Sequence, residues 1–561
     1  MLLRQPLITA TLVLILSSMP PAAAQQAARP EVDPGQVQRR IPEPIELERP
    51  PPPLAPPPPS EPVTAPQSAV RFVLTAVVID GATVFDPAVL APLYEDFLAR
   101  QIGLGDVEEM LRRITAKYRE SGYFLSHAVA EPQTLESGIL RVTVIEGGVQ
   151  SVSFPGLSES AADRLRPYAA AVLADRPLRL ATLERAILLI NDLPDLSVAP
   201  GLHLIDEKAG YYELVLAIDR SRFSGAVSLD NRGTRSLGPV EAQAVGGVSS
   251  ILTAFDRLAL NFFTVPNQPR ELLSEQLGYD LPLGFDGTRA ALTAARTDLH
   301  PHGNLASLAL AGDATHVGAG VTHPIIRLRD HSLWLGGTFD VLQSEQSQQG
   351  MRQFDDQLRM VRLHGLYLAD DGWGGSNSLS VEASQGLDAL GSSRSGASDL
   401  SRPNGRPDFT KVTGMAIRQQ HLIGSWYLRV AVAGQKSAQP LLVSEQFALG
   451  GTQFGRAYDP GEIAGDDGAA GSAELRYMGV IEDSVLRSYE IYGFYDLGAV
   501  WNMDVSDATR RQSLASVGVG LRLALRHNLN CSLEIADPLT RTVAAEGGKP
   551  VRVFASLSWG F

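Results

Sequence analysis

Cysteine is almost absent from this chain, since Cys531 is its one example in 561 residues. A single cysteine excludes an intrachain disulfide framework. Cys531 alternates with Leu533 and Ile535 on an apolar face, which favours packing over a reactive thiol. The ten histidines show no metal-ligand spacing, and neither H-E-x-x-H nor G-x-S-x-G occurs. The sequence therefore predicts no catalytic residue, no metal site, no cofactor and no enzyme.

Long apolar runs are also missing beyond the first residues, so no stretch can form a transmembrane helix. Any membrane crossing must then be a closed β-barrel, in which strands satisfy every backbone polar group. Residues 1–24 have the plan of a secretory signal peptide, with Arg4, an apolar segment at 7–16 and alanines at 22–24. The net charge of −14 leaves no basic excess for a nucleic-acid partner.

A proline-rich stretch separates the signal from the remainder of the chain. Residues 25–68 include proline runs at 50–53 and 56–59, which predict an extended linker without a core. Residues 31–40 could form a few helical turns, a possible short plug helix, and disorder is the alternative. The linker therefore leads into folded units that begin near residue 69.

Two small α+β modules are predicted after the linker, at 69–148 and 149–220. The first has an apolar run at 72–79, a helix, and β-type runs at 123–130 and 139–145. Its helix begins near Asp106, which stands at capping-box spacing from Glu109. The second module has a strand at 150–154, helices at 158–173 and 180–191, and a closing hairpin formed by 202–205 and 211–218.

Residues 221–561 alternate between apolar and polar or small side chains, with glycine-rich turns between the segments. The final residues, 551–561, place Trp559 and Phe561 on the apolar face, as in the last strand of an outer-membrane barrel. At about 21 residues per strand and loop, the span holds about 16 antiparallel strands. The predicted fold is a membrane β-barrel preceded by two α+β modules; an array of soluble β-sandwiches is the alternative.

Two segments near the end carry a candidate site. A Gly/Asp-rich loop at 450–471 contains Arg456 and Tyr458, and its Gly-Asp-Asp-Gly stretch predicts a turn rather than a calcium site. The strand at 489–500 places Asp496 on the face opposite its apolar row, inside the barrel. A guanidinium folded in from the loop could pair with this carboxylate. The alternative is a solvated loop and an unrelated interior aspartate.

The chain resembles the two-partner secretion transporters of the TpsB family, the haemolysin secretion/activation proteins of ShlB/FhaC/HecB type. Their inward loop carries a Val-Arg-Gly-Tyr/Phe motif, matched here by Gly455, Arg456, Ala457 and Tyr458, with two departures. Their aromatic-x-Asp-x-Gly strand motif is matched by Phe494, Asp496 and Gly498. Further matches extend the resemblance over nearly the whole mature chain. They are Gly122-Tyr123 in the first module, Leu183-Glu184-Arg185 in the second and Asp230-Asn231-Arg232-Gly233 in the first barrel hairpin.

The resemblance implies a pore in the bacterial outer membrane with two periplasmic POTRA modules. Such a pore recognises one large secreted exoprotein, a TpsA-like adhesin or haemolysin, and translocates it in extended form without ATP. Outer-membrane lipid, and the barrel-assembly machinery during biogenesis, are its other implied partners. Two alternatives remain: a barrel-assembly or insertase protein of the same superfamily, and a diffusion porin.

Overall fold

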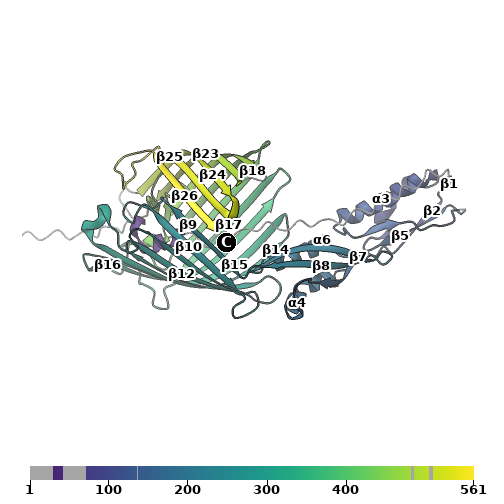
Figure 1. Cartoon of the computed structure of the whole chain (residues 1–561), viewed down its shortest axis with the longest axis horizontal. Coiled ribbons are helices and arrows are strands. Elements are labelled where there is room, and N and C mark those ends of the chain that lie inside the picture. The colour runs from purple at the N-terminus through teal and green to yellow at the C-terminus, as the bar shows by residue number, and fades with distance from the viewer. Residues whose placement is uncertain (1–29, 42–70, 136, 482–484, 504–509) are drawn as a thin grey trace, which may run out of the picture.

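A computed structural model describes residues 30–41, 71–135, 137–481, 485–503 and 510–561. Figure 1 shows a barrel with two small modules following one another away from one of its ends. The predicted signal peptide and most of the predicted linker lie outside the described residues. Among the helices that the structure describes, none is long and apolar enough to cross a membrane.

The first module packs helices against a three-stranded sheet of order β2-β5-β4 and a two-stranded sheet β1-β3. The apolar run predicted at 72–79 is divided into β1 and β2, and the strand predicted at 123–130 is shorter. Asp106 does not cap the helix as predicted: Gly103 is the N-cap, and Asp106 accepts its N–H at 2.8 Å. The elements are β1 Arg71–Val73, β2 Ala76–Asp80, α2 Pro87–Leu90, β3 Gln101–Gly103, α3 Leu104–Glu120, β4 His127–Val129 and β5 Ile139–Ile145, with 3₁₀ turns η2 Ala91–Leu93 and η3 Glu95–Phe97.

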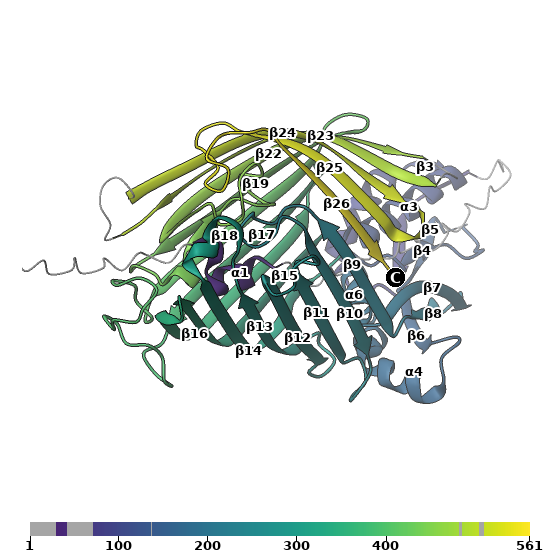
Figure 2. The same ribbon diagram turned by 60° about the vertical axis from the view of Figure 1, so that its left-hand side comes forward.

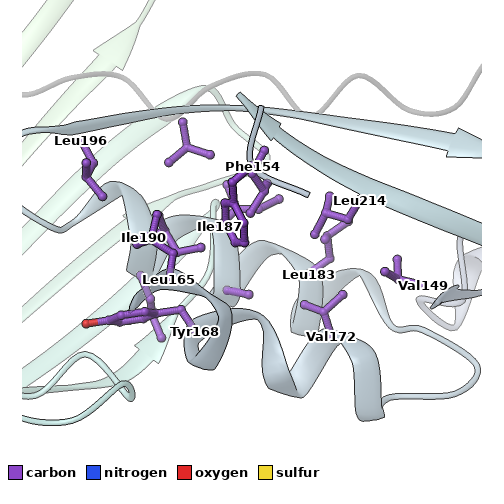
Figure 3. Close-up of a cluster of buried hydrophobic side chains, with 14 of the residues drawn as sticks. Val149, Phe154, Leu165, Tyr168, Val172, Leu183, Ile187, Ile190, Leu196 and Leu214 are labelled. Carbon is purple, nitrogen blue, oxygen red and sulfur yellow. The ribbon is translucent and has the colours of Figure 1, made fainter. Parts of the chain in front are cut away.

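The second module has a sheet of order β6-β8-β7 covered by helices. Figure 3 shows its core, in which Leu183, Ile187 and Ile190 of α6 point toward the sheet. The helix predicted at 158–173 is interrupted, because Pro167 lacks the N–H that an α-helix needs there. The elements are β6 Gly148–Ser153, α4 Glu159–Leu165, η4 Arg166–Ala169, α5 Ala170–Ala174, α6 Leu180–Asn191, β7 Leu196–Asp206 and β8 Tyr211–Arg220.

Sixteen antiparallel strands close into the barrel that the sequence predicts. Alternate side chains point outward and are apolar, such as Ile491, Leu497 and Val519, each more than half exposed. The strands are β9 Phe223–Asp230, β10 Glu241–Ser249, β11 Arg257–Thr264, β12 Leu272–Pro282, β13 Arg289–Leu299, β14 Leu310–Arg327, β15 His331–Gln348, β16 Met351–Asp370, β17 Gly375–Gly386, β18 Thr410–His421, β19 Trp426–Ser437, β22 Asp467–Val480, β23 Leu486–Trp501, β24 Arg511–Leu525, β25 Leu529–Pro538 and β26 Arg552–Gly560.

The rim of the barrel is uneven at the end far from the modules. Strand β16 pairs with β17 only from Met360 onward, whereas its pairing with β15 starts at Met351. The β15–β16 hairpin therefore extends nine residues, 351–359, beyond β17. The segment between β17 and β18 covers this extension, since the N–H of Leu387 donates to the carbonyl of Arg359 at 2.8 Å.

A short helix occupies the barrel interior. Helix α1 (Pro34–Arg40) follows the 3₁₀ turn η1 (Pro30–Val32), and Figure 2 shows α1 inside the ring of strands. Val32 and Val37 pack in one cluster with Phe263 of β11 and other apolar side chains of the wall. We call α1 the plug helix. It lies within the segment where the sequence left helix and disorder open.

Candidate functional site in the barrel lumen

The long segment between β19 and β22, residues 438–466, folds into the barrel; we call it the pore loop. It contains the 3₁₀ turn η6 (Val443–Glu445) and a small hairpin, β20 (Phe447–Leu449) with β21 (Ile463–Gly465). The loop ends earlier than predicted, because β22 starts at Asp467. Gly455 turns the tip of the loop with φ of +80°, a conformation that glycine adopts without strain.

Arg456 at the tip of the pore loop binds Asp496 of β23 through two parallel hydrogen bonds. Its Nε donates to Oδ2 and its Nη2 to Oδ1, both at 3.0 Å, and its backbone N–H also donates to Oδ2 at 3.1 Å. Both side chains are buried. Two further donors, the hydroxyls of Ser472 and Ser516, complete the shell of Asp496 at 2.7 and 3.4 Å.

The guanidinium of Arg456 has additional partners in the wall. Its Nη1 donates to Glu474 of β22 at 2.5 Å, and its Cζ lies 3.5 Å from the ring centroid of Phe494. Burial alone lowers the pKa of Arg456, but Asp496 and Glu474 raise it above its ordinary value, so the group stays charged. A larger set of charged and phenolic side chains surrounds the pair: Arg232, Arg476, Tyr492, Arg522 and Glu534.

The other residues of the two sequence motifs make room for the loop and hold it. The Oη of Tyr458 donates to the carbonyl of Ala515 at 3.1 Å, and the carbonyl of Ala457 accepts from Arg552 at 3.2 Å. A Cβ at Gly498 would lie 2.5 Å from Leu449 Cδ1, so glycine lets β20 approach the wall. The structure thus gathers Gly455, Arg456, Ala457, Tyr458, Phe494, Asp496 and Gly498 in one place.

Trp559 and Phe561, the predicted C-terminal signal, lie elsewhere. Both face outward from the barrel wall, with ring centroids 5.0 Å apart. Sequence reasoning missed Glu474 and Glu534, which complete the site from β22 and β25. Their strands alternate, so an inward position could have been read from the pattern. Their convergence on Arg456 required the register of the strands.

A second polar centre joins the pore loop to the plug helix. Glu445 lies fully buried between the Nζ of Lys411 (2.7 Å), the Nη2 of Arg362 (2.9 Å) and Arg39 of the plug helix (3.6 Å). Burial raises the pKa of Glu445, but these three cations together hold it well below its usual range. Gln36 of the plug helix also donates to the carbonyl of Gln446 at 3.0 Å. The loop is therefore bound to both the wall and the plug.

The turn predicted at residues 465–468 is instead a junction between strands, because Gly465 ends β21 and Asp467 begins β22. Asp466 is buried and accepts the N–H groups of Leu441 at 2.8 Å and Met503 at 2.7 Å, and it pairs with Arg402. Within the ranges that the structure describes, no group of three or more His, Cys, Asp or Glu residues is placed to hold a metal ion. The site is thus a network of ion pairs that positions a loop.

Comparisons with known proteins agree with this architecture. Residues 213–523 match the family model "Haemolysin secretion/activation protein ShlB/FhaC/HecB", and residues 72–147 match "POTRA domain, ShlB-type". The heme/hemopexin transporter protein HuxB of Haemophilus influenzae is 27% identical over 470 residues, 81% of each chain. The outer membrane transporter CdiB of Dickeya dadantii is 23% identical over 474 residues, also 81% of each.

A solved structure shares the fold. That of CdiB from Escherichia coli has a TM-score of 0.69 at 19% identity, covering 89% of this chain and 93% of its own. The family consists of transporters, in agreement with the absence of enzyme motifs from the sequence. The chain therefore belongs to the haemolysin secretion/activation family, the TpsB transporters of the outer membrane that secrete partner proteins and carry POTRA modules in the periplasm.

Proposed function

We propose that this pore exports one large exoprotein, an adhesin or haemolysin of TpsA type, which its POTRA modules recognise and which crosses in extended form. We assign residues 69–148 and 149–220 to the two modules and 221–561 to the barrel. The names of HuxB and CdiB connect relatives with hemopexin transport and with outer-membrane transport. For this chain, we infer that the partner is a large secreted exoprotein.

The modules offer a binding mode for an unfolded partner. Within the described residues, the outer strands of the sheets β2-β5-β4 and β6-β8-β7 each have one edge without a neighbouring strand of the same sheet. Such edges present backbone N–H and C=O groups, and an extended segment can add to them as a further strand. Recognition through the backbone suits a partner that arrives unfolded, because it requires few fixed side chains.

The lumen supports a gated rather than an open pore. The plug helix and the pore loop occupy the interior together, and they are joined through Glu445 and Gln36. The contact between these two elements inside the barrel is the observation on which the proposal depends, since a diffusion porin would gain nothing from it. We propose that Arg456 and Asp496 hold the loop in its inward position. Folding of the partner outside would oppose its return, so the proposal requires no ATP.

Co-expression with a candidate large exoprotein of TpsA type tests the proposal. We expect the exoprotein to reach the cell surface with the wild-type pore. Arg456→Ala and Asp496→Ala should each reduce the secreted amount at least fivefold while the barrel stays inserted. Equal secretion by both variants would contradict the role of the pair. An exoprotein that remains in the periplasm beside the wild-type pore would contradict the function itself.

Depletion of the chain distinguishes the insertase alternative. A secretion pore leaves the amounts of other outer-membrane barrels unchanged when it is depleted. A fall in those amounts, with unchanged secretion of the exoprotein, would favour a barrel-assembly protein instead.

A further inference from the structure

We infer that Phe255 is a positioning residue that docks the second module on the barrel, and that the β10–β11 hairpin transmits this docked position to the plug helix. The inference rests on the proposed function, since it explains how a receptor outside the barrel could act on the closed pore. It concerns the turn between β10 and β11, residues 250–256, on the side of the barrel that faces the modules.

Phe255 belongs to the barrel by sequence and to the second module by packing. Its side chain is 7% exposed and is part of the same apolar core as Ile187 and Ile190 of α6. With Leu165 of α4 and Leu196 of β7, it lines a small cavity at the junction. By contrast, Leu252 in the same turn is 76% exposed. The turn therefore inserts Phe255 into the neighbouring module, with the small side chain of Ala254 packed beside it.

The turn is built to hold this side chain in place. Phe255 has φ of +65°, a left-handed conformation that is costly for a large side chain. Asp256 is fully buried and accepts the N–H groups of Ile251 and Thr253, both at 2.6 Å, and the Oη of Tyr279 at 2.7 Å. Burial raises the pKa of Asp256, but these hydrogen bonds lower it to about 2. The carboxylate thus stabilises the strained turn.

Two further turns of the barrel, the one after β12 and the one after β14, also contact the second module. Arg327 at the end of β14 binds Asp192 at the end of α6 with two hydrogen bonds of 2.6 and 2.7 Å. Arg185 of α6 donates to the carbonyl of Pro324 at 3.2 Å, and the rings of Tyr168 and Phe285 meet edge to face at 5.3 Å. An apolar insertion with polar contacts around it resembles the anatomy of a specific interface.

The same core is closed at its other end by the first module. Leu125 of the first module is 3% exposed and belongs to the core that contains Phe255. The N–H of Leu178 donates to the carbonyl of Gly147 at 3.0 Å, and that of Leu180 to the carbonyl of Gly122 at 2.9 Å. One continuous core therefore joins the first module, the second module and the barrel.

The hairpin that carries Phe255 reaches the plug at its opposite end. The Oε1 of Glu241, at the start of β10, lies 3.4 Å from the Nη2 of Arg40 in the plug helix. Phe263 of β11 packs in one cluster with Val32 and Val37. Strands β10 and β11 pair without interruption between these ends. A displacement of the second module would therefore act on the two strands that contact the plug.

Distance measurements on the full chain test the docking. Spin labels at Ser160→Cys on α4 and Asp330→Cys on the turn after β14, in a Cys531→Ala background, report the separation of module and barrel. We expect a narrow distribution for the wild type and for Phe255→Leu. Phe255→Ala should broaden it, and Leu252→Ala, the matched control in the same turn, should leave it unchanged. An unchanged distribution in Phe255→Ala would overturn the positioning role.

Opening frequency in planar bilayers tests the link to the plug. We expect the pore of the Phe255→Ala variant to open at least five times as often as that of the wild type. The reason is that the turn between β10 and β11 is then no longer held in the second module. Asp192→Ala, which leaves the module core intact, should increase openings to a smaller extent. Broadened distances with unchanged openings would overturn the coupling. Neither measurement uses a partner, so a failure of the proposed secretion function would be seen separately.

Discussion

Asp496→Ala is the change whose effect the structure defines best. Asp496 accepts five hydrogen bonds, three from Arg456 and one each from Ser472 and Ser516. Removing one partner of a buried ion pair costs about 3–5 kcal/mol. We take the lower end, about 3 kcal/mol, because Glu474 still pairs with Arg456. At about 1.4 kcal/mol per factor of ten, the withdrawn loop should become roughly 150 times more populated.

Cysteine labelling can measure this population. Ala457 is fully buried beside Arg456, so a cysteine there reacts with a maleimide only when the loop leaves the wall. In a Cys531→Ala background, Asp496→Ala should accelerate labelling about a hundredfold. Lys436→Ala is the control, because it removes an exposed ion pair with Asp467 and should change the rate less than about fivefold. Equal rates for Asp496→Ala and its parent would refute the reasoning.

Three further changes have defined outcomes. Glu445→Gln leaves Lys411 buried without its full counter-charge, so the plug helix should be held less firmly. Openings in planar bilayers should become at least tenfold more frequent, and an unchanged opening frequency would argue against a link between the pore loop and the plug helix. Burial raises the pKa of Asp33, the N-cap of the plug helix, to about 7. A released Asp33 would return to its ordinary pKa of 3.8, so the stability that protonation gives to the bound plug is lost as the pH rises from about 4 to about 7. Openings should therefore increase over that range and level off above pH 7; Asp33→Asn should abolish that dependence. Gly455→Val places a β-branched residue at φ of +80° with its Cβ 2.5 Å from Leu514 Cδ1, and should accelerate the same labelling through about 1–3 kcal/mol of strain; a rate equal to the parent's would contradict this.

The two-residue period of the sequence predicted much of the barrel, because each strand has one lipid-facing row. This period placed Asp496 inside and Leu497 outside, as the structure has them. The helical period was equally informative for α6, whose bounds Leu180–Asn191 agree with the prediction. Patterns failed where side chains are small. The start of β22, at Asp467, was assigned to the loop because glycine and alanine show little contrast between the faces.

The site could be predicted only in part for a different reason. Arg456 and Asp496 were selected through motifs, and their pairing follows from an inward strand face and a loop that folds in. Glu534 lies 78 positions beyond Arg456, and the sequence does not encode the register that brings the two together. The position of the plug helix and the insertion of Phe255 into the second module likewise depend on contacts between distant segments.

The uneven far rim affects any chain that leaves the pore. Nine additional residues at about 3.3 Å each, on a strand tilted by about 40°, raise the β15–β16 hairpin roughly 20 Å above its neighbour β17. A polypeptide emerging on that side meets the extended hairpin and the segment between β17 and β18 that covers it. Nascent structure outside the cell would therefore form asymmetrically, with one flank shielded until several further residues have emerged.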